Sequence, residues 1–389
     1  MQPTSLRILQ TNFHRGWGGQ PSRILMVSKA LVERGHQLVI AAPAGSLLAV
    51  RSREAGLETF EEARFLKPKH VLSALADLSA LRRLLRTRRF DLVDAHGSQD
   101  LWTVAGATAL VADPPAFVFT RHNTKRVGDN LANRYLLRRR IDHLILASGS
   151  VLERYRPFLE RGDLSPDRIS VVHSSYREDR FHPGVDGAEI RKELDAVEKG
   201  ALLVGVVGRL VPDKGGTYFL KAVSKLAPKF PSARFLFVGT GTEEERLRRE
   251  TAALGLGDRV RFLGFRDDIP ALTAALDLSV LPSVDCDASS AVLKEAMAVG
   301  RPVVATDIGG ASEIVEHGRT GLIVPPADPD SLASAMAQIL EREDSGRALG
   351  EAGARRVREQ FGRDRMAEGT LEAYRRALQR RSLRSAGGR

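Results

Sequence analysis

The chain has 389 residues, of which 43% are hydrophobic and 28% are charged, with a formal net charge of +11. This length is enough for two domains with full cores, and the composition excludes a disordered chain. No stretch approaches the roughly 20 apolar residues of a membrane span. The single cysteine, Cys286, excludes an internal disulfide framework and a cysteine-based zinc site, and it is typical of a reducing cytoplasm.

The beginning of the chain predicts a strand, a helix and a second strand, at residues 6–10, 21–34 and 37–41. No signal-peptide pattern precedes the first strand. The loop between that strand and its helix contains Gly18 and Gly19. Glycines here let the backbone approach a ligand closely, or they form a simple tight turn. The order strand, loop, helix, strand predicts the start of a doubly wound parallel sheet.

Two histidines follow later strands of the first half. A strand at 91–96 runs into a polar loop at His96, and a strand at 116–120 is followed by His122. Ligands bind at the carboxyl ends of strands in open α/β sheets, although a single histidine there is more often structural. The other elements predicted in this half are a basic amphipathic helix at 75–89 and strands at 143–147 and 169–173.

The second half restarts the α/β pattern with an apolar run at 202–207, which is typical of a buried parallel strand. The loop after it contains Arg209 and Lys214 but lacks the spacing of a Walker loop. Taken alone, such charges are usually solvated. The remaining predicted strands are 234–238, 276–281 and 322–326, and a helix is predicted at 331–340.

The segment 281–310 predicts a polar loop, a helix and a strand. Ser289 or Ser290 can cap the helix, and Gly300 ends it. Two carboxylates mark the segment, Asp287 in the loop and Glu295 in the helix. A helix N-terminus attracts an anion, and neighbouring carboxylates can accept hydrogen bonds from sugar hydroxyls. The segment therefore suits a nucleotide sugar, or it is an ordinary crossover with solvated acids.

This segment resembles the E-x7-E region of the family-4 retaining glycosyltransferases of GT-B fold. The matching residues are Glu295-Ala296-Met297-Ala298, Gly300, Pro302-Val303-Val304-Ala305-Thr306, Gly309-Gly310 and Glu313. The first half of the motif departs, because Asp287 stands where a Glu is usual and residues 288–290 replace Gly-Phe-Gly. The resemblance spans nearly the whole chain and is most specific over residues 205–324.

The resemblance implies an α/β, GT-B architecture of two Rossmann-like, doubly wound domains that face a central cleft. An acceptor-side domain is expected at 1–182, completed by a C-terminal helix at about 364–384. The donor-binding domain is expected at 183–363. The implied activity is metal-independent, retaining transfer from a UDP-, GDP- or ADP-linked sugar, with no further cofactor.

The resemblance also implies roles for individual residues. It gives catalytic roles to His122 and Asp287, and it places His96 near the acceptor. Arg209 and Lys214 are expected to hold the donor phosphates, while Glu295 is expected to bind the ribose. The donor-binding positions are Gly18, Gly19, Arg209, Lys214, Gly264, Asp287, Ser289, Ser290, Ala291, Val292 and Glu295.

Other functions stay open at this point. Asp285-Cys286-Asp287 can be read as a DxD motif of a metal-dependent transferase. A sugar-nucleotide epimerase of GT-B fold is a second alternative. A basic nucleic-acid-binding module is a third, but the arginine clusters lack interleaved aromatics and only 6% of residues are aromatic.

The arginine clusters allow two interpretations. The simple one is a solvated helix face, and the functional one is peripheral contact with anionic lipid. Because similar enzymes often glycosylate lipid-linked acceptors, we expect a lipid-linked or cell-envelope glycan as acceptor, such as lipopolysaccharide. The expected location is the cytoplasm, including the cytoplasmic face of the inner membrane, and no nucleic-acid partner is expected.

Overall fold

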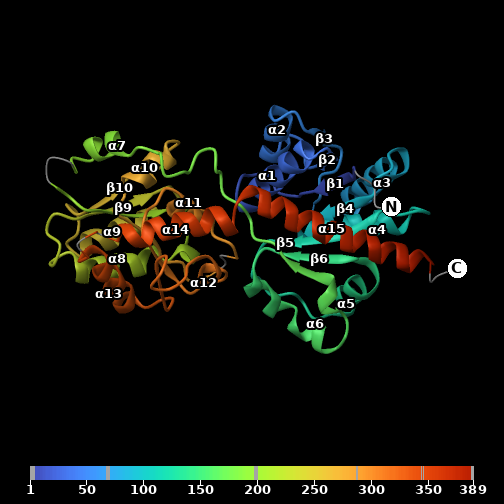
Figure 1. Cartoon of the computed structure of the whole chain (residues 1–389). Coiled ribbons are helices and arrows are strands. Elements are labelled where there is room, and N and C mark those ends of the chain that lie inside the picture. Colours follow the sequence, from blue (N-terminus) through green and yellow to red (C-terminus); the bar gives the residue numbers. More distant parts are fainter. Residues whose placement is uncertain are drawn as a thin grey trace. The chain divides into compact units, whose positions relative to one another are not determined.

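The computed structural model describes residues 5–66, 71–196, 200–285, 288–342, 344 and 346–386. The chain divides into two compact units (Figure 1). Unit 1 consists of Met1–Ser175 and Arg363–Arg389, and unit 2 is Tyr176–Gly362. The division after Ser175 lies slightly ahead of the place expected from sequence, near residue 182.

Unit 1 is built on a seven-stranded sheet with the order β3-β2-β1-β4-β5-β6-β7. Each pair of neighbouring strands in this sheet is parallel. The strands are β1 (Arg7–Thr11), β2 (Gln37–Ala41), β3 (Glu58–Phe60), β4 (Leu92–Ala95), β5 (Ala116–Arg121), β6 (His143–Leu146) and β7 (Ile169–Val171). β4 is buried along its whole length, as expected for a central strand covered on both faces.

The helices of unit 1 cover both faces of this sheet. They are α1 (Gly19–Glu33), α2 (Leu47–Glu54), α3 (Val71–Thr87), α4 (Ser98–Ala109), α5 (Leu131–Tyr135), α6 (Arg156–Glu160) and α15 (Arg363–Ala386). A π-helical turn, Leu136–Arg140, follows α5 directly. The C-terminal helix α15 packs against α1 and across β5 and β6 (Figure 1). Tyr374 and Ala377 of α15 are fully buried in the core of this unit.

Unit 2 is built on a six-stranded parallel sheet with the order β10-β9-β8-β11-β12-β13. The strands are β8 (Leu203–Val207), β9 (Arg234–Val238), β10 (Val260–Phe262), β11 (Leu278–Leu281), β12 (Val303–Thr306) and β13 (Leu322–Val324). The helices are α7 (Ala188–Glu193), α8 (Gly216–Leu226), α9 (Glu244–Ala253), α10 (Ile269–Ala275), α11 (Ala291–Ala298), α12 (Ala311–Ile314), α13 (Pro329–Leu340) and α14 (Arg347–Gln360).

Aromatic packing fixes α8 on the sheet of unit 2. Phe219 lies edge-on to Phe237, with ring centroids 5.3 Å apart, and it also contacts Phe235 at 6.3 Å. All three side chains are fully buried. Burying one such side chain stabilises the fold by roughly 1.5–3 kcal/mol. The start of α8, which directly follows Lys214 and Gly215, is therefore held in place by the core.

Each sheet has a point where the strand order reverses. In unit 1 it lies between β1 and β4, and in unit 2 between β8 and β11. Ligands of open α/β sheets bind beyond the carboxyl ends of the strands at such switch points. The predicted doubly wound α/β fold is thus confirmed, with one switch point in each unit. None of the described helices combines the length and the apolar composition that a membrane crossing requires.

Candidate functional site

The ends of β4 and β5 bring two predicted site residues together. Nδ1 of His96 lies 2.8 Å from Nε2 of His122, and the two rings stack with centroids 5.1 Å apart. His96 is buried and His122 is half-buried. The backbone of His96 is held by Asp100, whose Oδ2 accepts a hydrogen bond from the His96 amide at 2.9 Å. His122 is therefore the member of the pair that reaches the surface.

Asp94, on β4, lies behind this histidine pair. Its Oδ2 is 3.5 Å from Nε2 of His96, and its oxygens accept hydrogen bonds from Thr120 Oγ1 at 2.9 Å. The hydroxyl of Tyr374 donates to Asp94 Oδ2 at 2.8 Å, and Gln10 Nε2 donates to that hydroxyl at 3.1 Å. Because the Tyr374 hydroxyl accepts from Gln10 while it donates to Asp94, the two hydrogen bonds of this chain polarise and strengthen each other.

The burial of these groups determines their protonation. Burial raises the pKa of Asp94 to about 7, although hydrogen bonds from Tyr374 and Thr120 oppose the increase. Burial also lowers the pKa of His96 and that of His122 well below the usual value. Both imidazoles are therefore neutral near pH 7.

The contact between the two rings links their tautomers, because one of the two nitrogens must donate and the other must accept. When Asp94 is ionised, its charge favours a proton on the Nε2 of His96 that faces it. Nδ1 of His96 then accepts from Nε2–H of His122, which leaves a lone pair on Nδ1 of His122. That lone pair can accept a hydrogen bond from a hydroxyl group of a bound sugar.

The loop after β1 contains the two predicted glycines. Gly18 has an extended backbone, with φ 173, and precedes α1. A Cβ added at Gly18 or Gly19 would meet nothing within 4 Å, so the packing of the chain itself does not require glycine there. The loop after β1 also packs closely against the loop after β4, as Phe13 and Gly97 show. A Cβ added at Gly97 would lie 2.2 Å from the ring of Phe13. The loops of the unit 1 switch point therefore pack together and leave a backbone open to a ligand.

At the switch point of unit 2, the loop that follows β8 packs on the loop that follows β11. Lys214 is half-buried in a short 3-10 turn. Gly215 then has a φ of 67, and a Cβ there would lie 1.9 Å from the carbonyl oxygen of Pro282. The amide of Val284 donates to the carbonyl of Asp213 at 2.8 Å. Lys214 is therefore fixed beside the segment that leads into α11, and Arg209 is exposed in the same loop.

The N-terminus of α11 is capped by Ser290, whose Oγ accepts a hydrogen bond from the amide of Leu293 at 3.4 Å. The sequence left Ser289 and Ser290 as alternatives, and Ser289 instead accepts a hydrogen bond from Lys294 Nζ at 2.9 Å. Ala291 and Val292 form the half-buried first turn. The first-turn amide groups of α11 thus lie at the switch point. The predicted catalytic Asp287 lies outside the described residues, as does Cys286 of the alternative metal motif.

The remaining predicted donor residues are Glu295, on the helix that follows β11, and Gly264, in the loop that follows β10. Glu295 is half-buried on α11, and burial raises its pKa while Arg177, Lys294 and Arg180 oppose the increase. Gly264 follows β10 with a φ of 66, and a Cβ there would meet nothing within 4 Å. In the strand order, β11, which precedes Glu295, and β10, which precedes Gly264, lie on opposite sides of β8.

Sequence reasoning missed Asp94 and Tyr374. Asp94 reads as an ordinary polar residue inside a strand, and Tyr374 lies 280 positions further along the chain. No local pattern links two residues so far apart. The available signal was a carboxylate in a strand that is otherwise fully buried, because a buried acid needs hydrogen-bond donors.

The two units match families of known proteins. Residues 187–356 match the family described as Glycosyl transferases group 1, and residues 17–180 match Glycosyltransferase Family 4. The 2-deoxystreptamine N-acetyl-D-glucosaminyltransferase of Streptomyces fradiae is 30% identical over 406 residues, covering 95% of this chain and 93% of that protein. The chain belongs to the family-4 glycosyltransferases of group 1.

One further relative and one solved structure are also similar to this glycosyltransferase. A GDP-mannose-dependent alpha-(1-6)-phosphatidylinositol monomannoside mannosyltransferase of Mycobacterium tuberculosis is 34% identical over 198 residues, which is 49% of this chain and 51% of that protein. The solved structure of Alr3699/HepE from Anabaena in complex with UDP has a TM-score of 0.80 at 23% identity, and covers 94% of this chain and 99% of that one. The structural likeness supports the GT-B fold predicted from the sequence.

Proposed function

We propose that this glycosyltransferase moves a sugar from a nucleoside diphosphate sugar to an acceptor hydroxyl, with retention of configuration and without a metal ion or further cofactor. The observation that carries the proposal is the switch point of unit 2. There the loop with Arg209 and Lys214 is packed against the segment that leads into the N-terminus of α11. Two cations and a helix N-terminus suit a diphosphate.

The same groups supply the chemistry expected of a leaving-group site. As the glycosidic bond to the diphosphate breaks, negative charge develops on the leaving phosphate oxygen. Fixed cations and backbone N–H groups stabilise that charge in the transition state. Because these groups can replace a divalent ion, metal independence is the simpler mechanism. The alternative with Asp285, Cys286 and Asp287 as metal ligands is an outcome of the experiment below.

The histidine pair of unit 1 is the proposed contact to the sugar. A neutral His122 with its Nδ1 lone pair accepts a hydrogen bond from a sugar hydroxyl, which orients the ring as the leaving group departs. Gly18 and Gly19 provide a backbone that a donor phosphate can approach. Asp287, which sequence reasoning places at the donor sugar, and Glu295, which it places at the ribose, complete the proposed donor site.

For the acceptor we propose a lipid-linked or cell-envelope glycan, used at the cytoplasmic face of a membrane. The mannosyltransferase from M. tuberculosis, whose name specifies a phosphatidylinositol monomannoside, supports this class. The S. fradiae enzyme is named for 2-deoxystreptamine, a soluble aminocyclitol. Both names describe polyhydroxylated rings, so a panel of acceptors must include soluble and lipid-linked cyclitols.

A two-stage experiment on the purified chain tests this function. Thermal shifts with UDP, GDP and ADP and their sugars identify the base, because a ligand of the native state raises the apparent stability. Turnover with each acceptor is then measured, and the anomeric configuration of the product is read by NMR. We expect one base to stabilise the protein, a retained configuration, and no effect of EDTA. Loss of turnover with EDTA would support the metal-dependent alternative, and conversion of the donor without acceptor would support an epimerase.

Measuring the binding of the chain to vesicles and to oligonucleotides distinguishes anionic lipid from nucleic acid as the partner of its basic surface. We expect the basic chain to bind vesicles that contain anionic lipid, with weaker binding at higher salt. Preferential binding to an oligonucleotide, with no nucleotide-dependent thermal shift, would favour a nucleic-acid-binding module instead.

A further inference from the structure

A pocket of about 350 Å³ lies in unit 1 between the C-terminal half of α15 and the amino ends of β6 and β7. Asp142 and His143 line it where β6 begins, and Asp167 and Arg168 line it just before β7. The residues that α15 contributes are Arg376, Gln379, Arg380 and Leu383. These positions follow one another at intervals of three and four residues, so they share one face of the helix. We refer to this cavity as the α15 pocket.

The α15 pocket is separate from the candidate catalytic site. His96 and His122 follow the carboxyl ends of β4 and β5, whereas the pocket lies at the amino ends of β6 and β7. Because neighbouring strands of this sheet are parallel, the two sites lie at opposite edges of the sheet. A ligand of the α15 pocket is therefore neither the donor nor the acceptor of the proposed transfer.

His143 shows that the three arginines of the pocket lie close to one another. The pKa of this imidazole is lowered to about 4, first by burial and then by Arg376, Arg168 and Arg380. Its Nε2 lies 2.8 Å from Oγ of Ser170. A neutral imidazole is thus within electrostatic reach of guanidinium groups from two parts of the chain that are about 200 residues apart, and it adds no charge of its own.

Arg168 brings a buried positive charge to this cluster. The residue is only 4% exposed. Its Nη2 donates to the carbonyl oxygens of Leu137 and Ile141, while its Nε has no hydrogen-bond partner among the described residues. Burial and the nearby Arg380 lower its pKa only to about 10, so it is charged near neutral pH. A buried charge is unfavourable unless an opposite charge or a full set of hydrogen bonds compensates it.

The carboxylates that line the pocket do not supply this compensation. Asp142 accepts hydrogen bonds from the amide of Phe117 at 2.9 Å and from Nη1 of Arg384 at 2.8 Å. Asp167 is exposed, and a hydrogen bond from Ser165 is the largest cause of its lowered pKa. Both carboxylates are therefore engaged by groups that do not line the pocket.

The two arginines of α15 differ in their contacts. Arg376 is exposed and pairs at 2.5 Å with Glu372, one turn earlier on the same helix. Arg380 is half-buried, and its Nε has no hydrogen-bond partner within the described part of the chain. Neither Arg168 nor Arg380 forms an ion pair with a described carboxylate. Two guanidinium groups thus lie near each other with no counter-charge between them.

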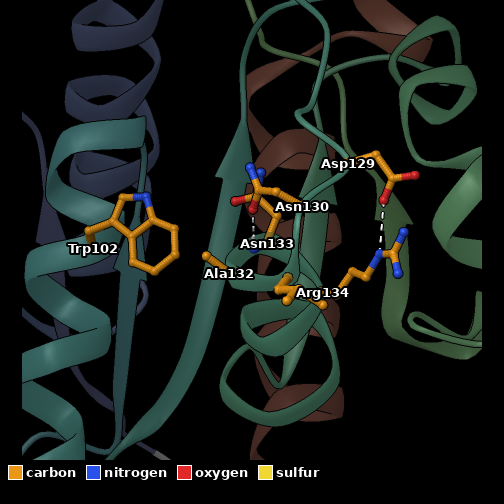
Figure 2. Close-up of a pocket in the computed structure, with 7 residues that line it drawn as sticks. Trp102, Asp129, Asn130, Ala132, Asn133 and Arg134 are labelled. Carbon is orange, nitrogen blue, oxygen red and sulfur yellow. Dashed lines mark hydrogen bonds and ion pairs between the residues drawn. The ribbon is translucent and has the colours of Figure 1, made fainter.

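Another hollow of unit 1 shows how such charges are balanced when a carboxylate is within reach. It has a volume of about 690 Å³ and lies between Trp102 and residues 129–134 (Figure 2). There Arg134 contacts Asp129 at 3.0 Å, and Arg161 contacts the same carboxylate at 2.8 Å. The α15 pocket contains no comparable pair between its described lining residues, so it retains an excess of positive charge.

We propose that the α15 pocket binds a phosphate group, which Arg168, Arg376 and Arg380 hold between the helix and the sheet. Phosphate oxygens accept charge-assisted hydrogen bonds from guanidinium groups, and several guanidinium groups can share one phosphate. The side-chain amide of Gln379 can donate a further hydrogen bond. The group is either a free phosphate or the head group of an anionic lipid, for which Leu383, 68% exposed, offers an apolar contact at the rim. This site adds to the proposed transfer and does not depend on it.

The bound phosphate has a mechanical consequence for α15. It links the helix to the start of β7, so the helix cannot move away from the sheet without breaking these contacts. Tyr374, which donates to Asp94 of the histidine network, lies two residues before Arg376 on the same helix. Phosphate should therefore stabilise the segment that holds this tyrosine in place.

Hydrogen–deuterium exchange of the full chain, read by peptide, tests the site. Inorganic phosphate is compared with sodium chloride at equal pH and ionic strength. At a concentration ten times its dissociation constant, a ligand that binds only the closed form slows exchange through opening about tenfold, so we expect this protection in peptides from residues 370–386. Phosphate that binds at Arg209 and Lys214 instead protects peptides from the loop after β8, so the location of the protection distinguishes the two sites.

A charge variant and a matched control locate the contact. Arg380→Gln should raise the dissociation constant for phosphate roughly tenfold or more, and Arg376→Gln should weaken binding at an exposed position that the fold does not need. Arg381→Gln removes the same charge about 100° further around the helix, outside the pocket, and should leave the constant unchanged. Absence of phosphate-dependent protection in α15, or equal effects of Arg380→Gln and Arg381→Gln, would overturn the proposal.

Vesicles identify the source of the phosphate group. The probes are vesicles of phosphatidylcholine with and without phosphatidic acid. Protection of residues 370–386 by phosphatidic acid that is lost in Arg380→Gln supports the site and assigns it to a lipid head group. Protection by inorganic phosphate but not by the vesicles supports the site and assigns it to a soluble phosphate. If neither probe protects α15, the pocket is not a phosphate site.

Discussion

The imidazoles of His96 and His122 form a hydrogen-bonded pair, with Nδ1 of the first 2.8 Å from Nε2 of the second. The pair joins two adjacent parallel strands at their carboxyl ends. Through it, the half-buried His122 is connected to a carboxylate, Asp94, that is 1% exposed. The tautomer of His122 is therefore linked to that of His96, whose Nε2 faces the buried acid.

Replacing His122 with alanine tests its contact with the sugar. We expect His122→Ala to lower kcat by about a hundredfold or more, because an orienting and proton-holding group is lost. The affinity for the bare nucleoside diphosphate should be nearly unchanged, because the proposed contact is to the sugar. Turnover at saturating donor and calorimetric binding of the nucleotide measure the two effects. A variant as active as the native protein would reduce His122 to a structural role.

A second prediction concerns Tyr374, whose hydroxyl donates to Asp94. Its hydrogen bond lowers the pKa of Asp94, which burial raises to about 7. Tyr374→Phe should therefore raise that pKa further, and activity that depends on ionised Asp94 should be lost near neutral pH and recovered as the pH rises well above 7. The acid limb of the kcat/KM profile moves to higher pH.

The other groups that face Asp94 do not explain such a shift. Arg23 is charged across this range, with a pKa of about 10, and the pKa of His96 and that of His122 lie well below the usual value. Asp100 has a pKa of about 7 as well, but its hydrogen-bond partners are Thr11 and backbone amides rather than Tyr374. Tyr135→Phe, at an exposed position on α5, is the matched control. An unchanged profile in Tyr374→Phe would leave the tyrosine a purely structural residue.

Asp94 and Tyr374 also show the limit of what could be predicted from the sequence. The apolar run at β8 predicted a buried parallel strand, because strands covered on both faces contain few polar residues, and the runs at β9 and β12 predicted strands. The loop glycines and the capping serine were equally local signals. The network around Asp94 was not predictable, because Tyr374 reaches it from a helix at the other end of the chain.

The arginine clusters show a second limit. Their spacing predicted a basic helix face, but several of the side chains are used within unit 1. Arg384 donates to Asp142 Oδ1 at 2.8 Å, and Arg140 donates to Thr108 Oγ1 at 2.9 Å. A long flexible side chain finds its partner only once the tertiary structure brings the two together, so the surface left for lipid was not readable from the pattern.

Lys214 provides the test of the phosphate contact. Lys214→Ala should weaken the binding of nucleotide sugar and of nucleoside diphosphate alike. The expected loss is roughly 2–5 kcal/mol if the ion pair between Lys214 and the donor phosphate is desolvated. Lys221→Ala removes an exposed lysine from α8 and serves as the control. Calorimetric titration of both variants with the diphosphate measures the difference. An unchanged dissociation constant in Lys214→Ala would remove this residue from the donor site.

Two glycines should respond to alanine in opposite ways. Gly19→Ala finds open space and should leave the melting temperature almost unchanged. It should weaken donor binding, because the added methyl group takes space through which the proposed ligand would approach the backbone. Gly215→Ala places a Cβ 1.9 Å from the Pro282 oxygen at a φ of 67, and should destabilise unit 2. Melting curves with and without nucleotide separate the two. Donor affinity of native strength in Gly19→Ala would show that the loop is only a turn.

The last prediction separates the two acids of the central segment. Glu295 is expected to hold the ribose, a contact that nucleotide and nucleotide sugar share, so Glu295→Gln should weaken both ligands. Asp287 is expected to contact only the sugar, so Asp287→Asn should lower the transfer rate and spare the bare nucleoside diphosphate. Aspartate is one methylene shorter than the usual glutamate, and the small side chains at residues 288–290 allow the sugar to come closer to the loop. Rates at saturating donor, together with nucleotide dissociation constants, distinguish the two variants. If Asp287→Asn is inactive because a required divalent ion no longer binds, Asp287 is a metal ligand and its assignment to the sugar is wrong.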